Sequence, residues 1–328
     1  MTDASTTGSA VTGPTSAALD TAALDTAALD PAALDPAVAG MPANARPVWR
    51  DNVATFASNR FALAGLVALV VIALLCFVGP HLYSTNQEAT NLINENLPPS
   101  GQFPLGTNPE GFDILGRLML GGQSTLEVGF AVALVATAFG TFWGAIAGYA
   151  GGLLDALLMR VVDTMLSIPF LFFVVLLGTL LQPTLPLIVV AIASVSWLST
   201  ARIVRGETLS LRTRDYVVAA RGFGNGHLRL VLRHVVPNAL GVVVVNATLK
   251  VADAILLFAS ISFLGLGVPP PATNWGRMLT TGINNLFDGY WWQLWPAAIA
   301  IVATVVAINA VGDGLHDVVE KRLGAGRR

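Results

Sequence analysis

The chain has 328 residues, of which 54% are hydrophobic and 12% are charged, and its formal net charge is −2 at pH 7. With a mean hydropathy of +0.67, it carries more apolar surface than an ordinary soluble domain can bury. The composition therefore excludes a soluble globular protein, and we expect a bilayer around the chain and no nucleic-acid partner.

The first 45 residues differ from the rest of the chain. They lack aromatic side chains and contain SAALD, TAALD, TAALD and PAALD in succession between Ser16 and Asp35. A period of five fits neither a coiled-coil heptad nor a solenoid, and Pro31 and Pro36 interrupt any helix. We predict a disordered cytoplasmic tail at residues 1–45, in preference to a docking element, and assign it no function.

Long apolar runs follow the tail. A hydrocarbon core about 30 Å thick is crossed by roughly 20 apolar residues in a helix, and it offers no partner for free backbone N–H and C=O groups. The run Phe61–Pro80 contains no charge and follows Arg60. We predict an all-α integral membrane protein with six transmembrane helices, at residues 61–80, 126–149, 157–181, 185–203, 236–264 and 294–312.

The distribution of Lys and Arg predicts the orientation of these helices. If both termini are cytoplasmic, the inner loops hold all of the 18 basic residues except Arg117, Arg277 and Lys250. Positive charge accumulates on the cytoplasmic side of membrane proteins. We therefore predict a multi-pass protein of a bacterial cell membrane with both termini inside.

The second predicted helix contains a stripe of small residues, Gly140, Gly144 and Gly148, at four-residue spacing. Such a stripe lets another helix approach closely. We predict helix packing here, without a role in substrate binding. By domain, we divide the chain into the tail, a first helix with an outer loop at 46–122, and a five-helix core at 123–320.

The longest cytoplasmic loop of the core, at residues 204–235, holds the densest basic cluster of the chain. Asp215 is predicted to cap a short helix at Tyr216–Gly222, which the glycine-rich residues 223–226 would end. A helix about 11 Å long is marginal alone and must be stabilised by packing on another surface. We expect a soluble partner to contact this loop.

The fifth predicted helix carries Lys250 and Asp253, which lie three residues apart and so on one helical face. Ionisable residues at membrane depth are candidates for function. Two interpretations stay open, namely an internal ion pair that is structural and a pair that lines the translocation path.

Motifs for catalysis, nucleotides and metals are missing from the sequence. It contains no GxxxxGK[ST] loop, and its lysines are Lys250 and Lys321. The histidines lack HExxH spacing and cysteine companions, and no GxSxG elbow occurs. We expect no catalytic, cofactor or metal site in this chain, so any driving energy must come from a partner.

The cytoplasmic loop resembles the EAA motif of ABC-importer permeases, in which Glu-Ala-Ala is followed by a glycine and then by a hydrophobic pair and proline. The matching residues are Ala219, Ala220, Gly224, Val235, Val236 and Pro237. Four further segments are similar to the dipeptide, oligopeptide and nickel branch of this family: 103–122 (FPLGTNPEGFDILGRLMLGG), 149–169 (YAGGLLDALLMRVVDTMLSIP), 262–279 (SFLGLGVPPPATNWGRML) and 291–317 (WWQLWPAAIAIVATVVAINAVGDGLHD).

The resemblance implies a type I ABC-importer permease fold and the C-type subunit of a dipeptide or oligopeptide system. In that family the permease pairs with a homologous permease, two ATPase subunits bind ATP and Mg, and an extracytoplasmic binding protein delivers the substrate. The permease itself is not an enzyme. The implied ATPase-coupling residues are Asp215, Tyr216, Ala219, Ala220, Arg221, Gly224 and Pro237.

The sequence departs from the family pattern at several positions. Val218 replaces the glutamate of the EAA triplet, and Phe258 replaces the usual glutamate ahead of the SFLGLG segment. Phe112 stands where the outer motif has arginine, and Asn108 stands where it has aspartate. Without the acidic residue at position 218, ATPase docking has to depend on Asp215, Arg221 and shape.

Two other functions compete with peptide import. The same family carries nickel, opines and other small solutes, and its specificity resides largely in the binding protein. A secondary transporter driven by an ion gradient belongs to a different class and would show inverted repeats, broken helices and a coupling-ion site. The sequence shows no such repeat, and the basic cytoplasmic loop would have no purpose in such a transporter.

Overall fold

A computed structural model describes residues 48–170, 172–173, 176, 183–222 and 227–325. The predicted tail at 1–45 lies outside these residues. Within them the chain is helical, and Thr107 and Asp113 form an isolated backbone bridge without any β-strand. The all-α fold class is thus confirmed.

The helices are α2 (Val48–Ser58), α3 (Arg60–Phe77), α4 (Gly79–Leu82), η1 (Leu92–Asn94), α5 (Ile114–Ala150), α6 (Gly152–Leu166), α8 (Leu185–Leu211), α9 (Asp215–Gly222), α10 (His227–Leu230), η2 (Val231–Val235), α11 (Val236–Phe263), α12 (Trp275–Asn284), η3 (Trp291–Gln293) and α13 (Trp295–Ala325).

Five helices in the described part of the chain are long and apolar enough to cross a membrane: α3, α5, α8, α11 and the segment Trp291–Lys321 that includes α13. Each corresponds to a predicted span. The third predicted span, at 157–181, begins within α6, and part of it lies outside the described residues. Three helices are longer than predicted, because α5 already begins at Ile114, α8 continues to Leu211 and α13 continues to Ala325.

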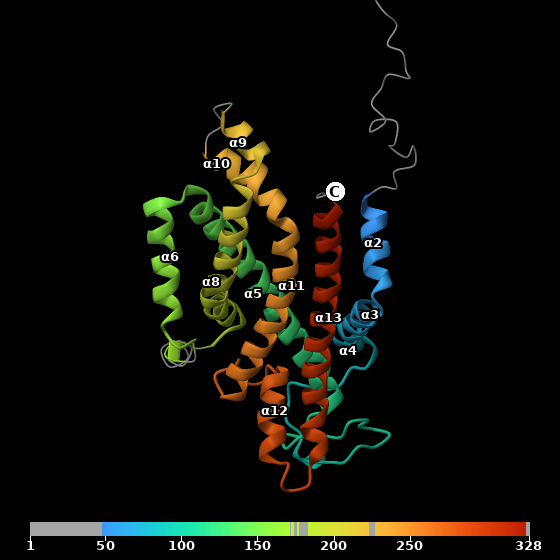
Figure 1. Cartoon of the computed structure of the whole chain (residues 1–328). Helices are drawn as coiled ribbons and strands as arrows, with labels where there is room; N and C mark the ends of the chain where they lie inside the picture. Colours follow the sequence, from blue (N-terminus) through green and yellow to red (C-terminus); the bar gives the residue numbers. More distant parts are fainter. Residues whose placement is uncertain (1–47, 171, 174–175, 177–182, 223–226, 326–328) are drawn as a thin grey trace, which may run out of the picture. The chain divides into compact units, whose positions relative to one another are not determined.

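Consecutive connections lie at opposite ends of the helices. Figure 1 shows α9 and α10 at the same end as the C-terminal end of α13, whereas α12 lies at the other end. Helix α5 packs against α8, α11 and α3, and α13 packs against α3 and α11. The basic loop and the predicted outer segments therefore lie on opposite sides of the apolar helices, as a membrane protein requires.

Short polar side chains fix where the long helices begin. Asn59 caps α3 by accepting hydrogen bonds from the backbone N–H groups of Phe61 and Ala62, both at 3.1 Å. Its side-chain nitrogen also donates to Asp317 Oδ2 at 2.9 Å, which joins the start of α3 to the last turns of α13. Asp113 caps α5 in the same way. Each cap satisfies backbone donors that would otherwise lack partners.

The glycine stripe of α5 lies directly against α8. A Cβ atom added to Gly140 or Gly148 would lie 2.7 or 2.8 Å from a backbone carbonyl oxygen of α8, and one added to Gly144 would overlap such an oxygen. These distances leave no room for any side chain, so the two backbones are in contact. The carbonyl groups concerned belong to Trp197, Arg205 and Ala201, for Gly140, Gly148 and Gly144 respectively.

Phe258, which replaces a glutamate of the family pattern, is fully buried in α11. It belongs to a core cluster that α5, α8 and α11 build together, with Val128, Ile192 and Ile261 among its members. A carboxylate in this place would be removed from water without a partner. The substitution therefore strengthens the apolar core between the three helices.

The outward faces of the long helices are apolar. In α3, Val67, Val71 and Leu74 are all more than half exposed, and in α13 Ile299 and Val302 are each 62% exposed. A soluble protein would not expose such continuous apolar surface. These faces are suited to contact with lipid tails.

Candidate coupling site

Helix α9 is held in place by one face that packs into a buried cluster. Val217 is fully buried, and Ala220 packs against the same cluster. A helix this short is not stable by itself, so this contact fixes its position. The cluster also contains residues of α5, α8, α10, η2 and α11: Ala145, Tyr149, Val204, Leu211, Leu230, Val231, Val235, Ala239 and Val243.

The opposite face of α9 is exposed. Asp215, Val218, Ala219 and Gly222 all lie on the surface, and their spacing of i, i+3, i+4 and i+7 places them on one side of the helix. A Cβ added to Gly222 would meet nothing within 4 Å. We call these four residues the α9 outer face. They provide a narrow surface of small side chains with one carboxylate at its start.

The start of α9 differs from the prediction by one position. Asp215 is the first residue of the helix, and the backbone carbonyl of Arg214 accepts the first helical hydrogen bond, from Val218 N–H at 3.0 Å. The carboxylate of Asp215 still lies in the first turn, where negative charge interacts favourably with the helix dipole. The last described residue of the helix is Gly222, and the predicted terminating residues 223–226 lie outside the described residues.

Some of the predicted coupling residues lie wholly or partly outside the described residues. Gly224 lies outside the described residues. Tyr216 and Arg221 belong to α9 by their backbones, and their side chains are not among the described ones. The structure thus brings Asp215, Ala219 and Ala220 together on one short helix.

Pro237 explains the irregular entry into α11. Proline has no backbone N–H, so it cannot donate the hydrogen bond that a regular helix needs at this point. The chain instead forms the π-helical turn η2, in which the N–H of Val236 donates to the carbonyl of Val231, five residues earlier. Such turns occur often at functional sites. Pro237 itself is exposed and lines a shallow hollow with Arg229, Leu232 and Arg233.

Positive charge gathers at the end of the molecule that carries α9. Arg214, Arg229 and Arg233 are exposed, and among the described residues none of them forms an ion pair. The neighbouring basic residues are engaged: Arg212 donates to Gly148 O at 3.0 Å, and Arg205 binds Asp155. The unpaired arginines leave this end of the molecule attractive to an acidic partner surface.

The polar groups of the predicted fifth span are also paired. Lys250 Nζ lies 2.8 Å from Asp253 Oδ2, with Lys250 largely buried and Asp253 exposed. On the same helix, Asn246 Oδ1 accepts a hydrogen bond from Thr200 of α8 at 2.8 Å. The first pair lies within α11 and the second joins two helices.

Sequence reasoning did not find the residues that hold α9 in place. Val217, Leu230 and Val231 come from three separate elements, and nothing in the spacing of one element indicates its contact with the others. One signal was available in the sequence, because the positions of Asp215, Val218 and Gly222 follow a helical period. That period indicates which side of α9 faces outward.

Comparison with known proteins supports a single family. Residues 140–325 match the family described as binding-protein-dependent transport system inner membrane component. Residues 48–99 match the N-terminal TM domain of oligopeptide transport permease C. The two matches lie in the same order along the chain as the predicted first helix and core.

Individual relatives agree with this result. The oligopeptide transport system permease protein OppC of Escherichia coli K12 is 41% identical over 86% of this chain and 94% of its own length. OppC of Bacillus subtilis is 38% identical over 84% of this chain and 90% of its own. The dipeptide transport system permease protein DppC of B. subtilis is 36% identical over 81% and 83%.

Proposed function

The chain belongs to the family of binding-protein-dependent transport system inner membrane components, and on that premise we propose that it is the permease subunit of an ATP-driven importer of di- or oligopeptides. The observation that carries the proposal is the 36–41% identity to oligopeptide and dipeptide permeases over most of the chain. Family membership removes the secondary transporter as an alternative. If the cargo were nickel or another small solute, the chain would still be a permease of the same class.

We infer that the α9 outer face is the coupling surface for an ATPase subunit. Its small side chains, together with the unpaired Arg214, Arg229 and Arg233 at the same end of the molecule, suit a groove with acidic walls. Val218 supplies no charge where the family has glutamate, so the contact depends on shape, on Asp215 and on the surrounding arginines. In this proposal the partner ATPases bind ATP and Mg, and this chain catalyses no reaction.

The seating of α9 suggests how movement of an ATPase reaches the membrane. Val217 contacts a cluster that includes the ends of α5, α8 and α11. A displacement of α9 therefore acts on three long helices at once. Closure of the ATPases around ATP would bias the permease between inward and outward access, which are two states of one element.

The remaining partners follow from the family and from the surfaces described above. We propose that a homologous permease pairs with this chain to form the translocation path, and that a binding protein delivers substrate at the end that carries α12. The apolar faces of α3 and α13 would contact the bilayer. The basic end with α9 would be cytoplasmic, in accordance with the distribution of positive charge.

Co-purification and transport together test the proposal. The chain would be tagged and purified from its native membrane, and uptake of a labelled dipeptide would be measured in vesicles with and without trapped ATP. We expect two ATPases and a second permease to be recovered, with peptide accumulation that requires ATP.

The other outcomes have distinct meanings. ATPases recovered without peptide uptake would preserve the class of transporter and refute the cargo. Recovery of the chain without any ATPase, under conditions that retain the second permease, would refute the coupling role of α9. Uptake that continues without ATP would contradict the proposed energy source.

A further inference from the structure

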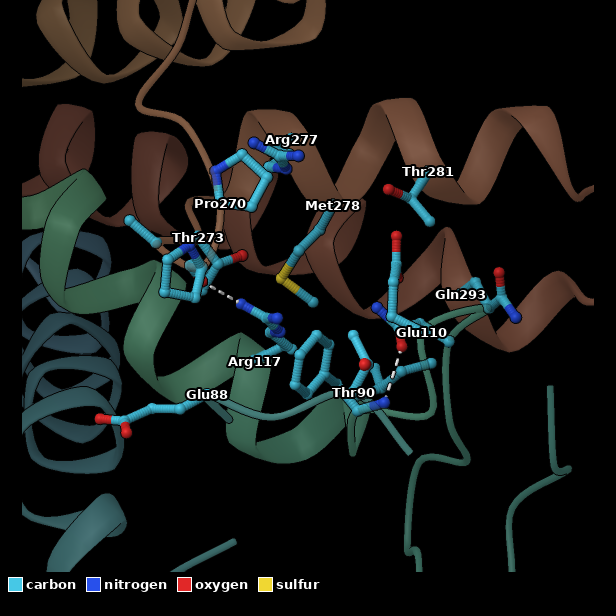
Figure 2. A pocket seen from close by; sticks show the side chains of 15 residues that line it. Glu88, Thr90, Glu110, Arg117, Pro270, Thr273, Arg277, Met278, Thr281 and Gln293 are labelled. Carbon is cyan, nitrogen blue, oxygen red and sulfur yellow. Dashed lines mark hydrogen bonds between the residues drawn. The ribbon is translucent and has the colours of Figure 1, made fainter. Parts of the chain in front are cut away.

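The end of the molecule opposite α9 contains a pocket of about 350 Å³. Figure 2 shows that its walls come from the segment before α5, from the start of α5, from the loop that precedes α12 and from α12 itself. Ligand sites are concave and of this order of volume, and they combine apolar walls with a few convergent polar groups. The volume is at the lower limit for such sites and suits a small ligand.

Arg117 forms the floor of this pocket, and among the described residues it has no ion pair, although Glu110 lies near enough to interact with its charge. The Arg117 side chain is 8% exposed, and Nη1 donates to the carbonyl of Pro271 at 2.6 Å. The guanidinium carbon lies 3.8 Å from the centre of the Phe112 ring. Nε is buried without a hydrogen-bond partner. The guanidinium of Arg117 thus keeps hydrogen-bonding capacity that the described part of the protein does not satisfy, and this is costly for a buried donor.

A second guanidinium, that of Arg277, lines the same pocket and donates to Val268 O at 3.2 Å. Among the described residues no carboxylate lies within 4 Å of Arg117 or Arg277. The acidic groups of the pocket, Glu88 and Glu110, are exposed and in contact with water. The guanidinium groups are therefore the more buried charges of the pocket, and the carboxylates lie at its exposed side, the mouth.

This separation of charge matches a small zwitterion. A carboxylate at the floor would accept hydrogen bonds from guanidinium groups that lack an ionic partner, and these are strong, charge-assisted interactions. An ammonium group at the mouth would pair with one of the two carboxylates, which lie on different sides of Arg117 in Figure 2. The side chains of Phe112 and Met278 would contact the apolar part of the ligand.

We propose that this outer pocket binds short peptides by their free C-terminal carboxylate, with Arg117 and Arg277 as the carboxylate-binding residues. The peptide as ligand rests on the proposed function, and the pocket itself does not. The pocket deepens that function, because it selects peptides that are short and have an unblocked C-terminus. It provides a site on the permease in addition to the one on the binding protein.

Binding to the purified transporter complex, without the binding protein, tests this inference. Isothermal titration would compare the dipeptide Ala-Phe with its C-terminal amide. Because each lost charge-assisted hydrogen bond weakens binding about tenfold or more, we expect the free acid to bind at least about tenfold more tightly than the amide. This comparison uses the unaltered protein and does not depend on the folding of any variant.

Two variants then assign the residues. Arg277→Gln changes a half-buried side chain, and Arg117→Met keeps the volume of the floor while removing its charge. Either one is expected to reduce the preference for the free acid to about threefold or less. Arg160→Gln on α6, an exposed arginine outside the pocket, is the matched control and should keep the full preference.

Three outcomes would overturn the inference. The first is equal binding of acid and amide to the unaltered complex. The second is a preference for the acid that survives both variants. The third is the absence of peptide binding to the unaltered complex, together with weaker association of the binding protein in the variants. The last result would identify a docking surface instead. A retained acid preference without any ATP-dependent uptake would refute the proposed function and leave the pocket standing, whereas uptake without the preference would refute the pocket.

Discussion

Arg205 binds both carboxylate oxygens of Asp155, with Nε 2.6 Å from Oδ1 and Nη2 2.7 Å from Oδ2. This two-pronged contact joins α8 to the start of α6, close to the end of the glycine stripe. The Asp155 side chain is 12% exposed and that of Arg205 is 35% exposed. The pair is thus partly shielded from water, and its geometry is the favourable one for arginine and carboxylate.

Asp155→Asn should reduce the free energy of unfolding of the detergent-purified protein by about 1–3 kcal/mol, because it leaves Arg205 without its ionic partner. The loss is measured as a lower thermal unfolding midpoint. Asp163→Asn is the matched control. Asp163 pairs with Arg202 at 2.6 Å, but both side chains are more than half exposed, so the effect should remain below about 1 kcal/mol. Equal effects of the two variants would show that burial of the first pair is irrelevant.

Gly144→Ala should separate α5 from α8, because the added methyl group overlaps the carbonyl oxygen of Ala201. We expect a loss of about 1–3 kcal/mol, measured as a lower unfolding midpoint. Gly206→Ala on α8 is the control, since a Cβ there meets nothing within 4 Å. It should stabilise the helix by about 0.5–1 kcal/mol. A stable Gly144→Ala protein would contradict the backbone contact.

Val217 and Val218 are adjacent and identical, yet one is fully buried and the other is 54% exposed. Val217→Ala removes packing under α9 and should lower stability by about 1–3 kcal/mol. Val218→Trp adds bulk without charge to a surface of small side chains, so it should leave the unfolding midpoint unchanged while reducing ATPase recovery on co-purification and ATP-dependent uptake at least about tenfold. Full recovery of the ATPases with Val218→Trp would exclude the α9 outer face as the docking surface.

Asp113 gives a prediction about pH. Burial raises the pKa of its carboxyl group above the ordinary value, although hydrogen bonds from the backbone N–H groups of Gly116 and Leu115 act against this shift. The folded protein therefore binds this proton more tightly than the unfolded chain does. This difference in proton binding contributes to folding stability. The contribution is fully present below the ordinary pKa of about 3.9 and is lost as the pH rises through the pKa of the folded state.

Asp113→Asn keeps a cap acceptor for α5 and removes the titration. The unfolding midpoint of this variant, relative to that of the unaltered protein, should therefore rise as the pH increases above about 4. The measurement is a set of melting curves at several pH values at constant ionic strength. A difference that stays constant or falls with increasing pH would refute the role of burial.

The orientation in the membrane can be tested by thiol labelling, because the single cysteine of the chain, Cys76, is 1% exposed and should not react while the protein is folded. Ile93→Cys should react with a membrane-impermeant maleimide in spheroplasts, because Ile93 is 89% exposed and lies at the α12 end. Ser210→Cys, at the α9 end, should react after permeabilisation. The reverse pattern would invert the proposed topology.

The parts of the fold that depend on local pattern were predictable. Apolar run length gave the five long helices, and the prediction of a short helix ending at Gly222 agrees with α9. The first three turns of α5 were not predicted, because residues 114–125 include Arg117, Gln123 and several glycines and do not look like a membrane span. They are helical because α12 and the outer segment bury them.

The outer pocket was also beyond the reach of sequence patterns. Arg117 and Arg277 are 160 positions apart, and the sequence indicated merely that both lie on the outer side. Their convergence depends on the contact of α12 with α5 and on Trp275, which is buried and donates to Leu118 O at 2.9 Å. The replacement of arginine by Phe112 was visible, but its stacking on Arg117 was not.

Along the glycine stripe, α5 and α8 touch through glycines on one side and mainly through backbone carbonyl groups on the other, and backbone groups have no side-chain rotamers to exchange. Any alternative arrangement of these two helices would have to break the close fit along several turns at once. The pair should therefore move as a rigid body throughout the transport cycle. Rearrangement is left to seams lined by long side chains, where a change of torsion angle costs little.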